Sequence, residues 1–307
     1  MPEASDGSFH NKLLNLINSI ISNRIDIPDG LSFAAIIGEN PSAGARSPKL
    51  WNAAFSALGM GTKMVPMDVS RERLNSLLEV LSKTSNFIGG AIAVPHKVAA
   101  AKWLGDRVSL EVKGIGAVNC LYRDEFGRIV GTNTDGEASR FSLIEKIGCI
   151  KEKKILILGS GGVGRAVSAF MSSGGGHVIW ASRNHPSTHE EHQLIGIKQV
   201  IAWRDIPTVL SEVNVVINCT TVGGGSQPNQ SPISSKDLAI LSSDSLVFDV
   251  IYDPRPTPLL LLAQEFGLET LDGLIMNREQ AVIAFNYAVK LNSQLSVDQL
   301  RLAMNIP

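Results

Sequence analysis

Apolar residues along the chain form two successive alternations of short continuous runs and longer stretches with helical spacing. In the first alternation, apolar runs at 32–38, 62–67 and 89–94 are separated by helical stretches at about 48–58 and 70–83. Short apolar runs are typical of buried strands, and apolar residues three or four apart are typical of amphipathic helices. The first part of the chain is therefore predicted to form a mainly parallel sheet that is covered on both faces.

A second alternation begins at residue 153 and predicts a doubly wound unit. Its predicted strands are 153–158, 177–182, 198–203, 214–220 and 246–252. A turn and a helix over 126–148 connect the two units, a long helix begins near Asp272, and an amphipathic helix at 9–23 precedes the first strand. The expected fold is α/β with two domains, an α/β substrate-binding domain from 1–136 with 272–307 and a Rossmann-type domain over 137–271.

Composition and charge narrow the possible roles. The 307 residues are 44% hydrophobic and 19% charged, which suits a folded protein with large cores. A formal net charge of −1 argues against a nucleic acid or an anionic membrane as the main partner. The cysteines Cys120, Cys149 and Cys219 lack metal-ligand spacing and favour a reduced, cytoplasmic setting. We expect neither a secretory signal nor a membrane-spanning stretch. We expect a monomer or a homodimer.

A glycine-rich loop follows the first strand of the second unit. In "ILILGSGGVGRA" the glycines Gly159, Gly161 and Gly164 stand in the GxGxxG pattern, between an apolar strand and a helix. Such glycines permit a tight turn and a close approach of the backbone to a pyrophosphate, which then meets the helix N-terminus. We predict that Gly159, Ser160, Gly161, Gly162, Val163 and Gly164 bind a dinucleotide. The alternative is a glycine-rich turn without a ligand.

The end of the next strand indicates which dinucleotide is bound. An NAD site usually has an acidic residue there, about 20 residues past the loop, that binds the ribose 2′-hydroxyl. This strand instead ends in Ser182, Arg183 and Asn184, which suit a 2′-phosphate. The sequence therefore favours NADP, with NAD possible, unless Arg183 is an ordinary surface residue.

Lys97 comes just past the end of a buried strand, in the stretch "GGAIAVPHK". A lysine there can carry a proton to or from a reacting oxygen, provided that a carboxylate holds its ammonium group. The candidate carboxylate is Asp135, which follows a turn at the junction of the two units. The alternatives are a structural Lys–Asp pair and two solvated residues.

Several blocks in the right order give the chain, from about residue 32 to 303, a resemblance to the shikimate/quinate dehydrogenase family. The most specific is "IGAVNCLYRDEFGRIVGTNTDG", which is similar to the family's IGAVNT…GxNTDG block. "VPHK", "LGSGGVGRA", "FDVIYDPRPTPLL" and "DGLIMNREQAVIAF" resemble four further blocks. The resemblance implies that Lys97 and Asp135 are the catalytic pair. It also implies a substrate site at Ser47, Asn119, Tyr252 and Gln280 and further cofactor contacts at Thr220, Val222, Gly273 and Met276.

The sequence departs from this family where the substrate carboxylate is usually bound. In "ARSPKLWN" Ala45 stands for the first serine of the family's block, Ser47 keeps the second, and Trp51 replaces a histidine beside Asn52. Ala91 and Ala93 stand where the family has an asparagine and a threonine. Arg46 either replaces the lost carboxylate contact or points to solvent, and Trp51 either fills the core or lines the pocket.

These observations predict an NADP-preferring oxidoreductase that transfers hydride reversibly between a cyclic polyhydroxy carboxylate and its ketone. Shikimate and 3-dehydroshikimate are the default pair. The alternatives are a family member that acts on quinate or another altered substrate, and a non-catalytic NADP-binding sensor.

Other chemistry is less well supported by the sequence. We expect no metal site, since His189 and His192 lack the spacing of a zinc hydrolase, and we interpret Cys219 as a small core residue. Asp249 and Asp253 flank Tyr252, but a paired-carboxylate hydrolase would leave the glycine loop unexplained.

Overall fold

The computed structural model describes residues 6–183, 196–197, 199–289 and 296–306, with side chains from residue 12 onward. The chain divides into two compact units. One unit comprises Met1–Thr134 and Ala281–Pro307, and the other comprises Asp135–Gln280. Both are α/β units, which confirms the predicted fold class.

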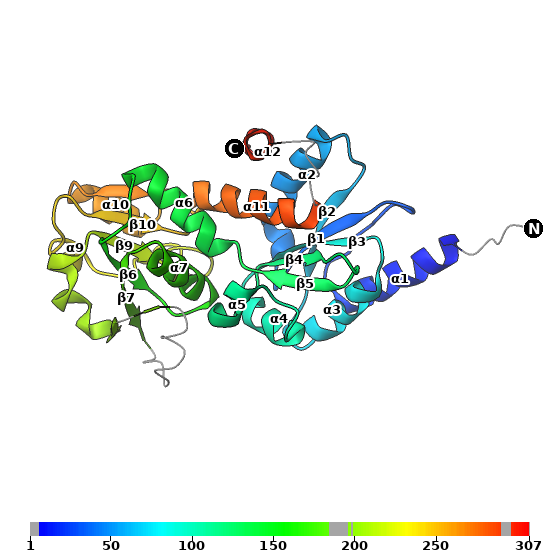
Figure 1. The fold of residues 1–307 in the computed structure, drawn as a ribbon, viewed down its shortest axis with the longest axis horizontal. Helices are drawn as coiled ribbons and strands as arrows, with labels where there is room; N and C mark the ends of the chain where they lie inside the picture. The colour runs from blue at the N-terminus through cyan, green and yellow to red at the C-terminus, as the bar shows by residue number, and fades with distance from the viewer. Residues whose placement is uncertain (1–5, 184–195, 198, 290–295, 307) are drawn as a thin grey trace, which may run out of the picture. The chain divides into compact units, whose positions relative to one another are not determined.

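The first unit is built on a five-stranded sheet with the strand order β2-β1-β3-β4-β5 (Figure 1). Its strands are β1 (Phe33–Gly38), β2 (Lys63–Asp68), β3 (Phe87–Ile92), β4 (Cys120–Arg123) and β5 (Ile129–Thr132). The first three are parallel to one another, as predicted, but β4 and β5 run antiparallel to their neighbours. The sheet is therefore mixed, with a hairpin at one edge.

Helices cover both faces of this sheet. One apolar cluster packs α1 (Asp6–Ile20), α3 (Leu74–Lys83), α4 (Lys97–Leu104) and α5 (Leu110–Ile115) against one face. A second cluster packs α2 (Ser47–Ala57), α12 (Val297–Ala303) and the last turns of α11 (Leu274–Val289) against the other face. Side chains alternate along a strand, so Ala35 and Ile37 of β1 enter the first cluster while Ala34 and Ile36 enter the second.

The N-terminal helix α1 packs on its own unit, which is the alternative favoured over packing on a partner subunit. Ile17 is buried and belongs to the first cluster, together with Ile21 just past the end of the helix. Leu16 is the exception, since 48% of its surface is exposed. The helix ends at Ile20, three residues before the predicted end.

The second unit has six parallel strands in the order β11-β10-β9-β6-β7-β8. They are β6 (Lys154–Leu158), β7 (His177–Ser182), β8 (Gln199–Ala202), β9 (Val215–Asn218), β10 (Leu246–Asp249) and β11 (Glu269–Leu271). The chain runs outward from β6 through β7 to β8 and then returns to β9 on the other side of β6. Open sheets with such a reversal bind ligands at the carboxyl ends of the strands on either side of it, here β6 and β9.

Helices cover both faces of the second sheet as well. α7 (Gly162–Ser173) packs on β6 and β7, and α6 (Asp135–Ile147) lies alongside α7 (Figure 1). The other face is covered by α9 (Ser235–Leu238), α10 (Pro258–Glu265) and the short 3-10 helices η2 (Trp203–Thr208) and η3 (Leu210–Glu212). Among the described helices, none combines the length and the apolar character needed to cross a bilayer.

Candidate active site

Lys97 lies at the carboxyl edge of the first sheet, where β3 gives way to α4. It is the first residue of α4 and is half-buried, so it belongs neither to the core nor to the open surface. His96 before it is fully buried, and its Nε2 lies 2.8 Å from the carbonyl oxygen of Val69. The backbone N–H of Val118 donates to the Lys97 carbonyl at 2.9 Å. The backbone that carries the lysine is thus held from two sides.

The antiparallel hairpin brings Asn119 and Thr134 to the same edge. β4 begins opposite the end of β3 and β5 ends opposite the start of β4, so the residues flanking the hairpin emerge together. Asn119 is buried, and its carboxamide accepts the Thr134 N–H at 2.8 Å and donates to Thr134 Oγ1 at 3.0 Å. The Asn119 carbonyl accepts the N–H of Ile92 at 2.8 Å. The structure therefore gathers the ends of three strands around Lys97 and Asn119, and Asp135 is the next residue after Thr134.

Asp135 is the first residue of the second unit and begins α6. It is buried, and its carbonyl accepts a hydrogen bond from Ser139 Oγ at 2.8 Å. α6 is fixed against α7 at this end, because a Cβ on Gly136 would lie 2.4 Å from the carbonyl oxygen of Ala166. The catalytic pairing of Asp135 with Lys97 stays a prediction.

The positions that depart from the family pattern lie in or against the second apolar cluster of the first unit. Trp51 is fully buried and packs edge-on against Phe55 and Phe285, and its indole N–H has no hydrogen-bond partner in the described structure. Trp51 is therefore a core residue, which settles the two alternatives left by the sequence. Ala91 is buried in the same cluster, and Ala45 and Ala93 pack against it half-buried.

Three polar residues of the same stretch have defined places in the first unit. Asn52 makes two hydrogen bonds with the backbone of Met64. Its Nδ2 donates to the Met64 carbonyl at 3.2 Å, and its Oδ1 accepts from the Met64 N–H at 2.7 Å. Arg46 donates to the carbonyl oxygen of Ile306 at 2.9 Å. Arg46 is half-buried in this position, and its contact with a substrate carboxylate stays a prediction. Ser47, the serine that is kept, is buried at the start of α2.

The glycine loop of the second unit has the shape that a pyrophosphate needs. Gly159 has φ +101°, and a Cβ on Gly164 would lie 2.1 Å from the Gly159 carbonyl oxygen, so only glycine allows this closure. A Cβ on Gly161 would meet nothing within 4 Å, and no side chain caps the N-terminus of α7. An open space in front of uncapped N–H groups fits an anionic ligand. Gly162 and Val163, the other loop residues, begin α7 and are half-buried.

Two side chains of β7 brace this loop. Trp180 Nε1 donates to the Gly159 carbonyl oxygen at 2.7 Å, and the hydroxyl groups of Ser160 and Ser182 lie 2.9 Å apart. Ser182 is buried, whereas Arg183 after it is exposed. Asn184, His189 and His192 lie outside the described residues. In the described part of the chain, no cluster of three or more His, Cys, Asp or Glu side chains could hold a metal ion.

The loop after β9 lies directly beside the glycine loop. A Cβ on Gly159 would be 2.9 Å from Thr220 Cγ2, and Val222 is fixed by its N–H to Thr220 Oγ1 at 3.1 Å. Cys219 is buried, and burial together with the nearby Asp249 and Asp135 carboxylates raises the pKa of its thiol well above the usual range. A thiol that stays protonated is a packing residue and not a nucleophile, as expected.

The remaining predicted residues follow β10 and β11. Gly273 approaches the end of β10 closely, since a Cβ there would lie 2.1 Å from the Val250 carbonyl oxygen. Met276 is buried, and its sulfur lies 3.1 Å from Ser139 Oγ. Gln280 Nε2 donates to the carbonyl of Asn277 at 2.9 Å, and Tyr252 is half-buried. Within the second unit, the structure therefore places Gly273 at the carboxyl end of β10 and Met276 against α6.

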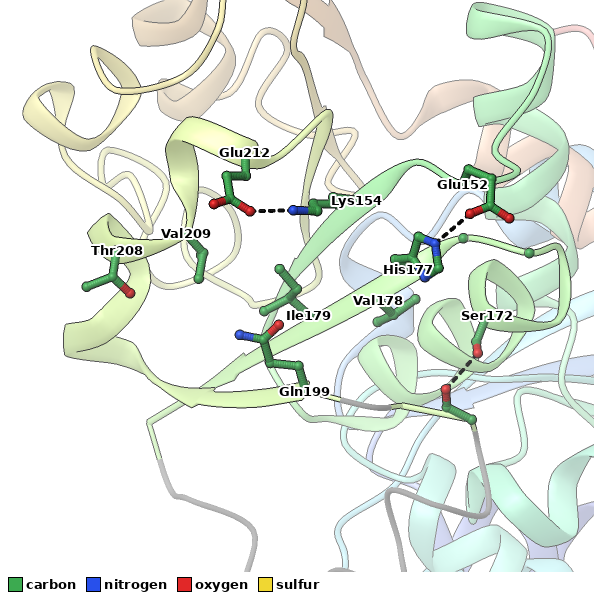
Figure 2. Close-up of a pocket in the computed structure, with 13 residues that line it drawn as sticks. Glu152, Lys154, Ser172, His177, Val178, Ile179, Gln199, Thr208, Val209 and Glu212 are labelled. Atoms are coloured by element: carbon green, nitrogen blue, oxygen red, sulfur yellow. Dashed lines mark hydrogen bonds and ion pairs between the residues drawn. The ribbon is translucent and has the colours of Figure 1, made fainter.

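A cavity of about 680 Å³ lies at the opposite end of the second sheet (Figure 2). It is lined by the first residues of β6, β7 and β8. In its wall an ion pair joins Lys154 to Glu212, and a hydrogen bond joins His177 to Glu152. Ligands of open parallel sheets bind at the carboxyl ends, whereas this cavity opens at the amino ends. The glycine loop, and not this cavity, is therefore the candidate cofactor site.

Sequence reasoning missed two groups that hold the loops of the candidate cofactor site. Trp180 reads as one more apolar residue of a strand, and only the structure shows its indole on the Gly159 carbonyl. Asp249 is buried and joined to Asn218 and Thr257 by hydrogen bonds of 3.0 and 2.7 Å. An acidic residue at the end of an otherwise apolar strand was the available signal for this network.

The doubly wound second unit, with its glycine loop at the reversal of strand order, defines an α/β protein of the dinucleotide-binding class. Comparisons with known proteins narrow the class. The profile described as "Shikimate dehydrogenase substrate binding domain" matches residues 36–121. The shikimate dehydrogenase (NADP(+)) of Carboxydothermus hydrogenoformans is 34% identical over 78% of this chain and 85% of its own length, and that of Thermosynechococcus vestitus is 33% identical over 82% and 88%. The chain belongs to the shikimate dehydrogenase family.

Solved structures agree with this membership. A shikimate dehydrogenase in complex with NADP+ superposes with a TM-score of 0.78 at 27% identity, over 91% of this chain and 96% of that one. The quinate dehydrogenase of Corynebacterium glutamicum in complex with NAD reaches 0.75 at 29% identity, over 89% and 98%. The 5-ketofructose reductase of Gluconobacter sp. strain CHM43 reaches 0.73 at 26% identity, also over 89% and 98%.

Proposed function

We propose that this protein is an NADP-dependent dehydrogenase that interconverts shikimate and 3-dehydroshikimate. One observation carries the proposal. An intact, uncapped glycine loop is present in a chain whose relatives at 33–34% identity are named shikimate dehydrogenase (NADP(+)). In this proposal the first unit binds the substrate and the second unit binds the dinucleotide. The proposed place of action is the cytoplasm, and the proposed assembly is a monomer or a homodimer.

Lys97 and Asp135 would handle the proton of the reaction. When bound, the reduced nicotinamide supplies the hydride that adds to the carbonyl carbon of the ketone. The Lys97 ammonium group then gives its proton to the oxygen that gains charge, and takes it back from the hydroxyl in the reverse direction. Asp135 would orient that ammonium group. Asn119, Ser47, Tyr252 and Gln280 would contact the other substituents of the ring.

The cofactor contacts follow the shape of the second unit. The loop from Gly159 to Gly164 would hold the pyrophosphate at the N-terminus of α7. Arg183 with its neighbours Ser182 and Asn184 would bind the 2′-phosphate of NADP, which an acidic residue would repel. Thr220, Val222, Gly273 and Met276 would contact the nicotinamide half. NAD is the second cofactor to test, because the related quinate dehydrogenase was solved with NAD.

A second candidate is a reductase for a neutral polyhydroxy ketone. It is favoured by the apolar side chains of Ala45, Ala91 and Ala93, which stand where the family has polar residues and lie in or against one hydrophobic cluster. A substrate carboxylate loses hydrogen-bond donors at these positions, and each loss costs roughly 0.5–1.5 kcal/mol. Three losses together would weaken binding by roughly tenfold to a thousandfold or more. The related 5-ketofructose reductase makes a ketose a reasonable trial substrate.

The test compares ketone substrates with both reduced cofactors. 3-Dehydroshikimate, 3-dehydroquinate and 5-ketofructose are each offered with NADPH and with NADH. The proposal expects the highest kcat/KM for 3-dehydroshikimate with NADPH, and a higher value for the ketose would select the second candidate. A Lys97→Met variant should lose turnover and keep its NADPH affinity, while Lys102→Met, an exposed lysine of the same helix, serves as the matched control. Tight NADPH binding without turnover of any of the three would support a non-catalytic sensor.

A further inference from the structure

Asp249 is a buried acid for which the proposed reaction has no direct use. It is the last residue of β10 and has no solvent-accessible surface. Its Oδ1 accepts hydrogen bonds from Asn218 Nδ2 at 3.0 Å and from the Ile251 N–H at 3.1 Å, and its Oδ2 accepts one from Thr257 Oγ1 at 2.7 Å. Three donors therefore converge on one carboxyl group in the core of the second unit.

Asn218 carries the influence of this carboxyl group to the cofactor side. Its Nδ2 donates both to Asp249 Oδ1 and to the carbonyl of Val222 at 3.0 Å. Its Oδ1 accepts from the Thr220 N–H at 3.0 Å and from Thr220 Oγ1 at 2.7 Å. All four hydrogen-bonding positions of the amide are occupied, and a flipped amide would turn an oxygen toward the carboxyl group. Asp249 thus dictates which way Asn218 faces.

The loop held by Asn218 forms one wall of the glycine loop. A Cβ on Gly159 would stand 2.9 Å from Thr220 Cγ2 and 3.3 Å from the Cys219 carbonyl oxygen. A small displacement of Thr220 is therefore felt by the glycine loop. Hydrogen bonds therefore join Asp249 through Asn218 to Thr220, and the Thr220 methyl group stands against the place that a side chain of residue 159 would take.

The partners of Asp249 decide where a proton can go. Asn218 Nδ2 and the Ile251 N–H are donors only, so a proton on Oδ1 would displace both. The Thr257 hydroxyl can change from donor to acceptor, which makes Oδ2 the site of protonation. Burial raises the pKa of Asp249 to about 6, against the opposing effect of its three hydrogen bonds. The Cys219 thiol, whose own pKa is raised by Asp249 and Asp135, is a further titratable group beside the network, and no described cation contributes to the shift of Asp249.

We propose that Asp249 is a positioning residue for the dinucleotide. As a carboxylate it fixes Asn218, which holds residues 220–222 in the arrangement that binds the cofactor, and its protonation loosens that arrangement and weakens binding. The inference rests on the proposed dinucleotide binding by the second unit and is independent of the identity of the substrate.

Calorimetric titrations with NAD+ and NADP+ from about pH 5 to about pH 8 test this role. NAD+ is the decisive ligand, because the 2′-phosphate of NADP+ has its own ionisation near pH 6. The wild-type Kd for NAD+ should fall roughly threefold to tenfold as the pH rises through this range, as expected when one hydrogen bond gains a charged acceptor. Asp249→Asn should bind at all pH values as weakly as the wild type does at low pH. Asp244→Asn, an exposed acid of the same unit, should follow the wild type.

A second pair of variants excludes a merely structural role. The Thr257 hydrogen bond lowers the pKa of Asp249, so Thr257→Val should move the midpoint of the binding profile to higher pH, while Thr257→Ser should leave it unchanged. Equal pH profiles for the wild type and Asp249→Asn, or an unmoved midpoint in Thr257→Val, would overturn the inference and leave the proposed function intact. Failure of the wild type to bind either dinucleotide at any pH would instead overturn the proposed function.

Discussion

Replacing Asp249 by asparagine should change how the stability of the second unit depends on pH. The substitution keeps the shape of the side chain and removes its charge. The carboxamide oxygen of the Asp249→Asn variant can still accept from Asn218 and Ile251, and its NH2 group can donate to the Thr257 hydroxyl, so the three contacts of the wild-type carboxyl group are kept. The difference between the two proteins therefore isolates the ionisation of Asp249.

The sign and size of the effect follow from the pKa of this carboxyl group. Burial raises it from 3.8 to about 6 in the folded protein. The folded state then binds the proton more tightly than the unfolded state, so the contribution of Asp249 to stability is complete below about pH 4 and is lost as the pH rises through about 6. A difference of about two units corresponds to about 3 kcal/mol at about 1.4 kcal/mol per unit. As the pH rises through about 6, the free energy of unfolding of the wild type should fall by this amount relative to that of Asp249→Asn.

Native-state hydrogen exchange of the buried amides in β9 and β10 is the suitable assay. The exchange of these amides reports the free energy of opening of the second unit alone. The measurement therefore does not depend on whether the two units unfold together. Glu212 and Asp124, whose pKa values are lowered by hydrogen bonds and by Lys154 and Arg128, are common to both proteins and cancel in the comparison. The reasoning would be refuted if the difference in opening free energy between the wild type and Asp249→Asn stayed constant from about pH 4 to about pH 7. It would also be refuted if the wild type became the more stable of the two as the pH rises.

Three further substitutions give separate expectations. Gly164→Val should lower NADP+ affinity roughly tenfold to a hundredfold in a calorimetric titration, because its Cβ would stand 2.1 Å from the Gly159 carbonyl oxygen, and unchanged affinity would contradict this closure. Trp51→Phe should change the free energy of unfolding in urea by less than about 1 kcal/mol, because the lost volume is offset by removal of a buried, unpartnered N–H; a loss above about 3 kcal/mol would show that this N–H is bonded. Arg123→Met should cost the first unit about 3 kcal/mol in the same assay, since the carbonyls of Phe87 and Thr84 lose donors at 2.7 Å, and a neutral result would contradict their burial.

Ionisation of Asp249 is expected to act in opposite directions on the stability of the second unit and on dinucleotide binding. The ionised carboxyl group is a cost to the stability of the second unit, yet in our proposal it holds the loop beside Gly159. Natural proteins often keep such destabilising groups where binding depends on them. An Asp249→Asn protein that is more stable at neutral pH and binds dinucleotide less well would show both effects at once.

Much of the fold could be predicted because the apolar pattern of each segment matches the way that segment packs in the folded protein. The parallel strands of both units are continuous apolar runs, since helices cover both faces of each sheet. The hairpin of β4 and β5 was not predicted, because strands of four residues carry too little pattern to separate from a loop. The same holds for the three-residue strand β11. The antiparallel direction of β4 matters to the site, because it brings Asn119 to the end of β3.

The candidate site was predictable where a motif fixes backbone geometry and unpredictable where distant segments meet. The glycine loop follows from a local requirement, because Gly164 must lie against Gly159. The partner of Arg46 is the carbonyl of Ile306, 260 residues away, and no pattern near Arg46 indicates it. Trp51 likewise owes its burial to Phe285 of α11. Sequence alone could therefore name the departures from the family and could not say where those side chains go.

The most direct measurement is the rate of NADPH oxidation by 3-dehydroshikimate in the wild-type protein, with the organic product identified. Our account predicts saturable turnover that yields one shikimate for each NADPH consumed. NADPH that binds at the second unit but is never oxidised by this ketone, whatever its concentration, would contradict the proposed activity.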